Sequence, residues 1–495
     1  MPEHASDGEA REFAVSFRTF LDWVYSASGE NRNEVSALVL DFLGAESAGH
    51  SVVTRDLPPF EHVNLQTALD AWSARPGRTV EVRGIAMPPH YGGLNLQQLV
   101  AGDGLPPVRL SAPALTDLPN GPGSTLACLR RGLLLVTDPH GRYVVMVQEP
   151  DEHQPALQVE VAGLPVGAAQ DLLAELDALR SELNVYRGHL LDVSLTPMGT
   201  VALAFAEPAG LRREDVVLPD AVLGRIERHA LGVAAHRDAL LAAGQHLKRG
   251  LLLFGPPGTG KTHTTRYLLG QMTGHTRLVV TGRVLVAIGA VTDLARVLLP
   301  AVVVLEDVDL VAEDRSMGPR SNPVLFDLLD AMDGAAGDAD LLFLLTTNRA
   351  DVLEPALAAR PGRVDVAVEI ELPDAAARER LLALYGQNVP LALTAEDVAT
   401  AVERTDGTTA SFLKEVIRRA VLESLHEDPV LTAVTGEHLA RALDDLLDDA
   451  QAVTRTLLGV GVDPETLPAG GALGPMAGPA AMMARRRAMM RRFSG

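Results

Sequence analysis

Residues 255–262 read Gly-Pro-Pro-Gly-Thr-Gly-Lys-Thr and directly follow an apolar run at residues 251–254. A strand that ends in a glycine-rich loop and leads into a helix is typical of a phosphate-binding loop. Glycine lets the backbone turn its N–H groups toward phosphate oxygens, and the positive end of the following helix adds to that field. The alternative is a glycine-rich turn that only joins a strand to a helix.

The motif assigns a role to each position of the loop. We expect Lys261 to reach the β- and γ-phosphates of a nucleotide and Thr262 to hold Mg²⁺. The sequence therefore predicts a site for ATP and Mg²⁺. The nucleotide-contacting residues expected are Gly255, Pro256, Pro257, Gly258, Thr259, Gly260, Lys261, Thr262 and His263.

The composition permits several domains with large apolar cores. At about 150 residues per domain, a chain of 495 residues is expected to form roughly two to four domains. Aromatic residues make up 4% of the chain and hydrophobic residues 47%, so Leu, Val and Ala must build the cores. The formal charge of −21 argues against attraction of the whole surface to nucleic acid or anionic lipid, although a local basic patch can still bind either.

The cysteine count and the hydropathy pattern indicate the cellular compartment. Cys128 is the single cysteine, so no internal disulfide can form. The sequence shows neither a secretory signal pattern nor an apolar run long enough to span a bilayer. We therefore expect a cytoplasmic protein with no transmembrane segment.

The N-terminal region shows mainly helical spacing. Residues 13–25 and 33–42 have apolar residues at helix-like intervals, whereas residues 85–123 are rich in Pro and Gly. We expect a mainly helical region over 1–123, with a domain boundary at its end.

Residues 124–215 are interpreted as an α+β domain. Apolar runs at 133–136 and 143–147 flank an Asp-Pro-His-Gly turn and predict a β-hairpin. A leucine stripe from Leu172 to Leu183 predicts a helix packed on these strands. At its end, Tyr186 and Arg187 are either partner contacts or a buried Tyr and a solvated Arg. Nothing in residues 1–215 carries recognisable catalytic chemistry.

From residue 216 onward, apolar runs alternate with helical stretches. This pattern predicts an α/β fold with a parallel sheet and helices on both faces over residues 216–373. The run at residues 301–305 ends in Glu306 and Asp307, which places these acids at the carboxyl edge of the sheet, where ligands of open α/β sheets bind.

Taken together, the motifs resemble those of the AAA family of ATPases from about residue 217 to 450. Besides the phosphate loop, the chain has Leu-Leu-Asp-Ala-Met-Asp-Gly at 328–334, Leu-Thr-Thr-Asn at 345–348, and Arg-Pro-Gly-Arg-Val-Asp at 360–365. The resemblance implies a P-loop NTPase sheet, a helical lid over residues 374–450, a Mg²⁺-dependent ATPase and a hexameric ring. It also implies that Asn348 is the sensor-1 residue and that Arg360 and Arg363 are arginine fingers.

The acidic pair departs from the usual wording of the family. Most relatives end this strand in Asp-Glu, whereas this chain has Glu306-Asp307, an order similar to that of the mitochondrial AAA chaperone that assembles the Rieske protein. We expect the roles to follow position, with Glu306 on the metal side beside Thr262 and Asp307 as the base that orients water. The alternative is a site that binds nucleotide without hydrolysing it.

Two further segments bear on the partners. Family members that thread polypeptides carry an aromatic pore loop, but residues 282–289 contain no aromatic residue, which leaves aliphatic Val286 and Ile288 as candidate client contacts. Residues 451–495 are expected to form a flexible basic tail. The basic residues near its end are Arg485, Arg486, Arg487, Arg491 and Arg492. They could bind nucleic acid, lipid headgroups or a neighbouring acidic surface, or they only improve solubility.

The function predicted from these motifs is that of an ATP-driven remodeller of protein assemblies, with clients chosen by residues 1–215. A nucleotide-dependent scaffold or switch is one alternative. A nucleic-acid-associated ATPase that uses the basic tail is another, and the acidic bulk of the chain makes it the weaker one.

Overall fold

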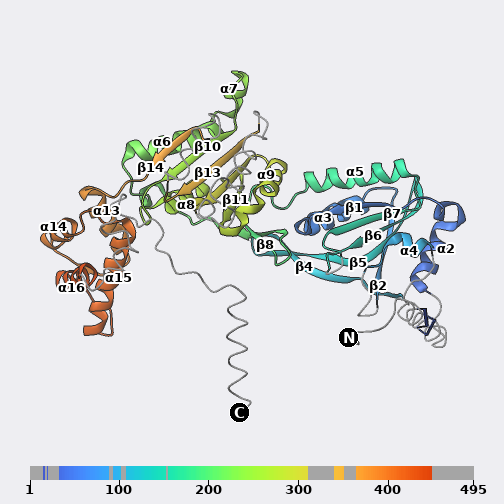
Figure 1. The fold of residues 1–495 in the computed structure, drawn as a ribbon, viewed down its shortest axis with the longest axis horizontal. Coiled ribbons are helices and arrows are strands. Elements are labelled where there is room, and N and C mark those ends of the chain that lie inside the picture. Colours follow the sequence, from blue (N-terminus) through green and yellow to red (C-terminus); the bar gives the residue numbers. More distant parts are fainter. Residues whose placement is uncertain are drawn as a thin grey trace, which may run out of the picture. The chain divides into compact units, whose positions relative to one another are not determined.

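A computed structural model describes residues 15–16, 19–20, 33–87, 93–101, 108–151, 154–309, 339–349 and 364–448. The chain divides into two compact units (Figure 1). The first contains Met1–Gly255 and Lys261–Ile370, and the second contains Pro256–Gly260 and Glu371–Gly495.

The N-terminal part of the first unit is built on a seven-stranded sheet in the order β1-β7-β6-β5-β2-β3, with β4 paired to β5. Every recorded pairing in this sheet is antiparallel. Its strands are β1 (Val53–Leu57), β2 (Thr79–Ala86), β3 (Arg109–Ser111), β4 (Ala114–Gly121), β5 (Ser124–Asp138), β6 (Gly141–Gln148) and β7 (Leu157–Ala162).

Helices cover both faces of this sheet, which explains the continuous apolar runs in β5 and β6. On one face, α3 (His62–Ser73) and α5 (Val166–Glu182) pack over Leu134 and Val136. On the other face, α2 (Glu34–Ala48) and α4 (Leu96–Ala101) pack over their neighbours Leu133 and Leu135 (Figure 1). Successive side chains of a strand point to opposite faces, so a strand with both faces buried is apolar at every position. The predicted hairpin and the predicted leucine-rich helix are both confirmed.

This sheet crosses the boundary that we placed after residue 123, and the described part of the region before that boundary contains strands as well as helices. It contributes β1, β2, β3 and β4, and β4 pairs with β5 across the boundary. The Pro- and Gly-rich stretch concealed β4. A strand that contains Pro119 is tolerated because β4 pairs with β5 and does not lie within the main strand order.

The second sheet of the first unit has the order β14-β10-β13-β12-β11-β8-β9. All recorded pairs are parallel except β8 with β9. Its strands are β8 (Leu190–Leu195), β9 (Val201–Ala206), β10 (Arg249–Phe254), β11 (Thr276–Thr281), β12 (Ala301–Glu306), β13 (Leu341–Thr347) and β14 (Val366–Glu369).

Helices also cover both faces of the second sheet, so the predicted α/β fold is confirmed. One face packs against α6 (Asp220–Ala235) and α8 (Lys261–Gln271). The other packs against the 3₁₀ turn η3 (Gly282–Ala287) and α9 (Ile288–Val297). The remaining short elements of this unit are η1 (Pro59–Glu61), η2 (Arg213–Asp215) and α7 (Arg237–Ala242).

Strands β8 and β9 precede the boundary that we placed between residues 215 and 216, so we expected them in the α+β domain. They extend the second sheet beyond β11, so residues 190–206 share its hydrogen bonding instead of closing a separate α+β domain. Their apolar sequence suits either sheet, so the local pattern does not reveal the pairing partner.

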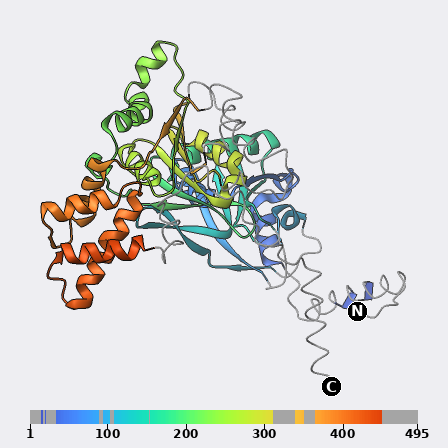
Figure 2. The ribbon, with the colours of Figure 1, turned by 60° about the vertical axis from the view of Figure 1, so that its left-hand side comes forward.

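The second unit is a helical subdomain, as predicted for the lid. Its helices are α13 (Ala375–Gly386), α14 (Ala395–Arg404), α15 (Ala410–Glu427) and α16 (Gly436–Leu447), shown in orange in Figure 2. A two-stranded parallel pair joins β15 (Leu391–Ala392) to β16 (Val434–Thr435). The Asp374 side chain accepts from Ala377 N, and the Thr409 side chain accepts from Phe412 N, so α13 and α15 each begin with an N-cap.

Candidate functional site

Three strands of the second sheet deliver polar residues to its carboxyl edge. Gly255 follows β10, Glu306 ends β12, and Asn348 follows β13. These strands are neighbours in the sheet and run parallel, so their ends lie side by side. The structure therefore brings the phosphate loop, the acidic pair and Asn348 to one edge of the sheet.

The phosphate loop leaves β10 through a position that only glycine can occupy. Gly255 has φ +142°, and a Cβ atom there would lie 2.3 Å from the carbonyl oxygen of Ile370. At the other end of the loop, Lys261 is buried at 6% exposure, and its Nζ donates to Gly255 O at 2.8 Å. Burial lowers the pKa of Lys261 to about 8, although Asp307 and Asp309 act in the opposite direction.

The middle of the loop belongs to the second unit and contacts the start of α15. Ser411 N donates to Gly258 O at 3.1 Å. Thr259 Oγ1 donates to Pro256 O at 2.9 Å within the loop itself. Ser411 ends a run of small residues, Gly-Thr-Thr-Ala-Ser, at 407–411.

Glu306 pairs with the first helical turn after the loop. Its side chain lies near Thr262, the residue predicted to hold the metal. Burial raises the pKa of Glu306, and Asp307 and Asp192 raise it further, whereas Arg266 and the Thr262 hydroxyl act to lower it. Burial thus outweighs the favourable influence of Arg266 on the Glu306 carboxylate.

Asp307 pairs with a different residue. Asn348 Nδ2 donates to Asp307 Oδ1 at 3.3 Å, and Asp307 N donates to Thr346 Oγ1 at 3.1 Å. Asp307 has φ +52°, and it is the one non-glycine residue with positive φ recorded in the described ranges. Left-handed backbone of this kind is costly and is concentrated at functional sites, where surrounding structure holds it in place.

A third acidic residue, Asp309, escaped the sequence analysis. It is 6% exposed, and its Oδ1 accepts from Thr347 Oγ1 at 2.9 Å and from Asn348 N at 3.2 Å. Asp309 therefore fixes the backbone that carries Asn348. The signal that points to it is its place two residues after Asp307 in the same acidic run.

Of the other predicted site residues, the structure describes His263 but not Arg360 or Arg363. His263 is exposed, and its Nε2 hydrogen-bonds to the carbonyl oxygen of Asp215 at 3.0 Å. Arg360 and Arg363 lie outside the described residues, as do residues 328–334 and the basic tail.

Side-chain burial decides between the candidate partner contacts Val286 and Ile288 and between the two interpretations of Tyr186. Ile288 is 1% exposed and packs in the core of the second sheet, so it is wrong as a client contact, whereas Val286 is 62% exposed. Tyr186 is buried, and its hydroxyl donates to Phe60 O at 2.8 Å, so the interpretation of Tyr186 as a buried residue holds. None of the helices in the described part of the chain combines the length and hydropathy of a membrane span.

Comparison with known proteins identifies the middle of the chain. Residues 251–372 match the family described as "ATPase family associated with various cellular activities (AAA)". The ATP-dependent zinc metalloprotease FtsH of Mycobacterium tuberculosis is 34% identical over 220 residues, which cover 42% of this chain and 28% of that protein. FtsH of Alkalihalophilus pseudofirmus is 32% identical over 222 residues, covering 42% of this chain and 32% of that protein.

The chain thus spans about a third of the length of the curated relatives that it matches. One solved structure, the FIGL-1 AAA domain in complex with ADP, aligns over 49% of this chain and 89% of its own, at 22% identity and a TM-score of 0.39. The zinc-protease motif His-Glu-x-x-His is not found in the sequence, where His426-Glu427 is followed by Val430 instead of a second histidine. Within the described ranges, no group of three or more His, Cys, Asp or Glu side chains is placed to hold a metal ion.

Proposed function

Starting from a chain that carries an AAA-family ATPase domain, we propose that it binds ATP with Mg²⁺, hydrolyses ATP and uses the cycle to remodel protein assemblies. One observation carries the catalytic part of this proposal. The two adjacent acids at the end of β12 have separate partners, Glu306 with Thr262 and Asp307 with Asn348. Hydrolysis needs two such positions, one beside the metal and one beside the attacking water.

The residues on the phosphate side fit a nucleotide with its metal. Thr262 and Glu306 offer a hydroxyl and a carboxylate, the hard oxygen donors that Mg²⁺ accepts directly or through water. When bound, the metal neutralises charge on the β- and γ-phosphates. The burial that raises the pKa of Glu306 and lowers that of Lys261 disfavours both charged forms, and a nucleotide–metal pair supplies the opposite charge for each.

On the water side, Asp307 acts as the base. Its backbone is left-handed, and Asn348 holds one of its carboxylate oxygens. The other oxygen is then available to accept a proton from a water molecule. Because Asp is one methylene shorter than the usual Glu, the attacking water must sit closer to the sheet edge, and we expect slow turnover.

A ring completes the site. Arg360 and Arg363 would act on the nucleotide of a neighbouring subunit, because guanidinium groups match the geometry of phosphate oxygens. Such fingers contribute about 10³–10⁵ in turnover in other phosphoryl-transfer enzymes. The support for this part is the resemblance of the Arg-Pro-Gly-Arg-Val-Asp run to the family motif.

Subunit mixing tests the ring. We expect subunits with Arg360→Ala and Arg363→Ala to be inactive alone, and Lys261→Ala subunits likewise. A mixture should regain turnover, since Lys261→Ala subunits still donate fingers to intact phosphate loops. If subunits exchange and no mixture exceeds the sum of its parts, the fingers do not act between subunits.

The client is the least defined part of the proposal. The N-terminal sheet with its helices is the region outside the AAA domain that is large enough to bind one. Capture of partners by full-length Asp307→Asn protein in ATP, compared with the native chain in ADP, tests this role.

A nucleotide-dependent switch is the second candidate, and the exposed aliphatic Val286 in place of an aromatic pore residue favours it over threading. The captured partner separates the two. A remodeller's turnover rises when partner is added, and the partner complex dissociates in ATP but not in a non-hydrolysable analogue. Dissociation in the analogue at the same rate supports the switch.

A further inference from the structure

Arg277 is a buried arginine at the end of the second sheet opposite the nucleotide site. It is the second residue of β11 and is 5% exposed. Its Nη1 donates to Leu269 O at 2.9 Å, its Nη2 donates to Gly188 O at 3.1 Å, and its backbone N donates to His189 O at 2.9 Å. All the hydrogen bonds recorded for Arg277 among the described residues thus go to main-chain carbonyl groups.

Such use of a guanidinium is costly. Burial lowers the pKa of Arg277, and no carboxylate is recorded as its partner in the described ranges. A buried charge is usually paired, because removing it from water otherwise costs free energy. The two carbonyl groups it holds come from segments about 80 residues apart in sequence, which suggests that joining them is its purpose.

The first carbonyl belongs to the phosphate-binding helix. Helix α8 starts at Lys261 and ends at Gln271, so Leu269 lies in its last turn. A cation at this position is favoured by the negative end of the helix dipole. A helix of 11 residues is about 16 Å long, so α8 connects the phosphate loop at one end to Arg277 at the other.

The second carbonyl belongs to the segment that connects the two sheets. Gly188 lies between α5 and β8 and has φ +78°. Its N–H donates to Thr276 Oγ1 at 2.9 Å, while its carbonyl accepts from Arg277. The first two residues of β11 therefore hold both main-chain polar groups of Gly188, an arrangement we call the Gly188 clasp.

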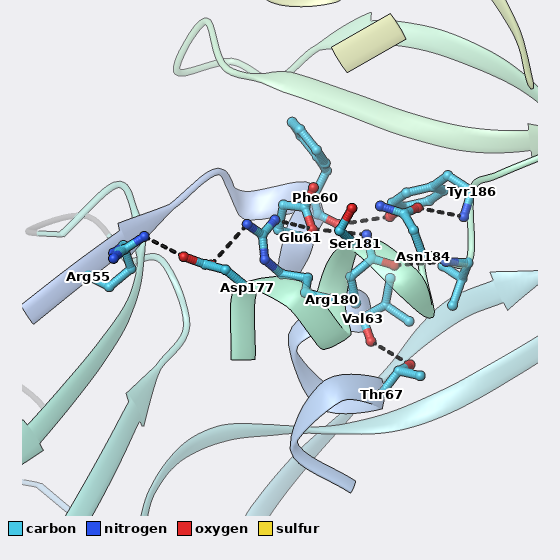
Figure 3. Close-up of polar contacts among 12 residues, drawn as sticks. Arg55, Phe60, Glu61, Val63, Thr67, Asp177, Arg180, Ser181, Asn184 and Tyr186 are labelled. Carbon is cyan, nitrogen blue, oxygen red and sulfur yellow. Dashed lines mark hydrogen bonds and ion pairs between the residues drawn. The ribbon is translucent and has the colours of Figure 1, made fainter. Parts of the chain in front are cut away.

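The same connecting segment is fixed on its other side by the N-terminal sheet's helices. Val185 N donates to Asn64 Oδ1 at 2.9 Å, and Tyr186 Oη donates to Phe60 O at 2.8 Å. Figure 3 shows the polar network around these contacts. In it, Arg180 pairs with the buried Glu61 at 2.7 Å.

Apolar packing reinforces the connection. The Tyr186 ring stacks on Phe205 of β9 at 5.5 Å between centroids and meets Phe60 edge-on at 6.4 Å. Val63 of α3 and Cys128 of β5 share one buried cluster with Leu191 of β8. Hence the connecting segment is no flexible linker, because residues from both sheets bury and bond it.

We propose that Arg277 is a positioning residue that links the phosphate-binding helix to the N-terminal sheet through the Gly188 clasp. Nucleotide that fixes the start of α8 also fixes its end, and the clasp passes this restraint to residues 184–189. Linkage is reciprocal, so loosening the clasp also weakens nucleotide binding. This inference rests on the proposed nucleotide site and specifies how the site is coupled to the client-binding region.

The test is hydrogen exchange of the full chain with and without Mg²⁺–ADP, followed in the peptides that cover residues 184–189 and the end of α8. In the native chain, nucleotide should slow exchange at 184–189 by about fivefold or more, the lower range of typical coupling. Arg277→Met, which keeps the length of the side chain and removes its donors, should bind nucleotide more weakly. At saturating nucleotide it should show protection at the phosphate loop but none at 184–189.

Two companion variants separate coupling from general damage. Arg296→Met, the same substitution at an arginine that pairs with Asp293 on α9, should behave as the native chain. Arg277→Lys reaches one carbonyl at a time and should restore part of the protection, which also provides a reading if Arg277→Met fails to fold. Full nucleotide-dependent protection at 184–189 in either folded Arg277 variant would overturn the proposal.

The nucleotide-free samples distinguish failure of the proposed nucleotide site from failure of the proposed Arg277 link. Without nucleotide, Arg277→Met should speed exchange at the end of α8 and at 184–189 together, whereas Arg296→Met should change neither. If the native chain binds no nucleotide, the proposed ATP site is refuted. The comparison of Arg277→Met with Arg296→Met without nucleotide still decides whether Arg277 joins the end of α8 to residues 184–189. Unchanged exchange at 184–189 in Arg277→Met would refute the tie itself.

Discussion

Two sets of buried charged groups in the second sheet, one at its amino edge and one at its carboxyl edge, are stabilised in different ways. At the amino edge, Arg249 donates to Asp340 at 2.7 Å, and His275 lies 3.5 Å from the same carboxylate. At the carboxyl edge, Lys261 is buried and donates to a backbone carbonyl, and Glu306 lies near Arg266 and the hydroxyl of Thr262.

The pKa values record this contrast. Burial acts to raise the pKa of Asp340, but His275 and Arg249 outweigh it and bring the value down to about 2. At the other edge burial prevails, raising the pKa of Glu306 and lowering that of Lys261 to about 8. The Arg249–Asp340 pair is thus stabilised in its charged form by partners within the fold, whereas at Lys261 and Glu306 burial outweighs the nearby charges. This difference separates structural charge from functional charge.

The largest expected effect comes from breaking the amino edge. Arg249→Met leaves Asp340 buried without its main partner, and loss of one member of a buried pair costs about 3–5 kcal/mol of unfolding free energy. Chemical denaturation followed by circular dichroism measures this loss. If Arg249→Met were as stable as the native chain, the amino edge would not be the structural one.

A comparable change at the carboxyl edge should affect turnover and spare stability. Lys261→Ala removes the cation that contacts the β- and γ-phosphates, and loss of such a charge-stabilising donor costs about 10²–10³ in rate. Its unfolding free energy should stay near the native value, because burial already disfavours the charged amine. Steady-state phosphate release and denaturation of the same preparation report both quantities, and a large loss of stability with intact turnover would reverse the contrast.

The amino edge also predicts a response to acid. The pKa of Asp340 is lower in the folded chain than in the unfolded chain, so its contribution is complete above about pH 4 and is lost as pH falls toward 2. A shift of this size corresponds to about 2 kcal/mol. The native chain should therefore lose about that much more stability than Asp340→Asn between pH 5 and 2. Asp293→Asn, at an exposed carboxylate, is the control and should follow the native curve.

The smallest effect is expected at the carboxyl edge in mild alkali. A phosphate group favours the ammonium form of Lys261, whose pKa in the ligand-free chain is about 8. Nucleotide affinity should therefore fall as pH rises above 8, by up to about tenfold per unit. Fluorescent-nucleotide titration from pH 7 to 9.5 measures it. Lys261→Arg, which stays charged throughout, should bind with a flat profile, and an equally steep profile for that variant would assign the effect to another group.

The sequence predicts the carboxyl edge well because its signals are local. An apolar strand precedes each of the phosphate loop, the Glu306-Asp307 pair and Asn348. These strands are parallel neighbours, so their carboxyl ends lie together. What was missed depends on contacts between distant segments. The pairing of β8 with β11, the Gly188 clasp and the burial of Ile288 are tertiary choices that no neighbouring residue specifies. The backbone N–H of Asp307 likewise donates to Thr346, on another strand.

The most direct test of the central claim, that the reversed acidic pair divides metal and water roles by position, compares Glu306→Gln with Asp307→Asn in one assay. Nucleotide binding is titrated with and without Mg²⁺, and a single turnover is then timed. We predict that Asp307→Asn binds Mg²⁺–ATP normally and hydrolyses it about 10²–10⁴-fold more slowly, the usual cost of losing a general base. We also predict that Glu306→Gln loses the Mg²⁺ dependence of binding. Normal metal-dependent binding with blocked hydrolysis in Glu306→Gln, and a metal defect in Asp307→Asn, would contradict the account.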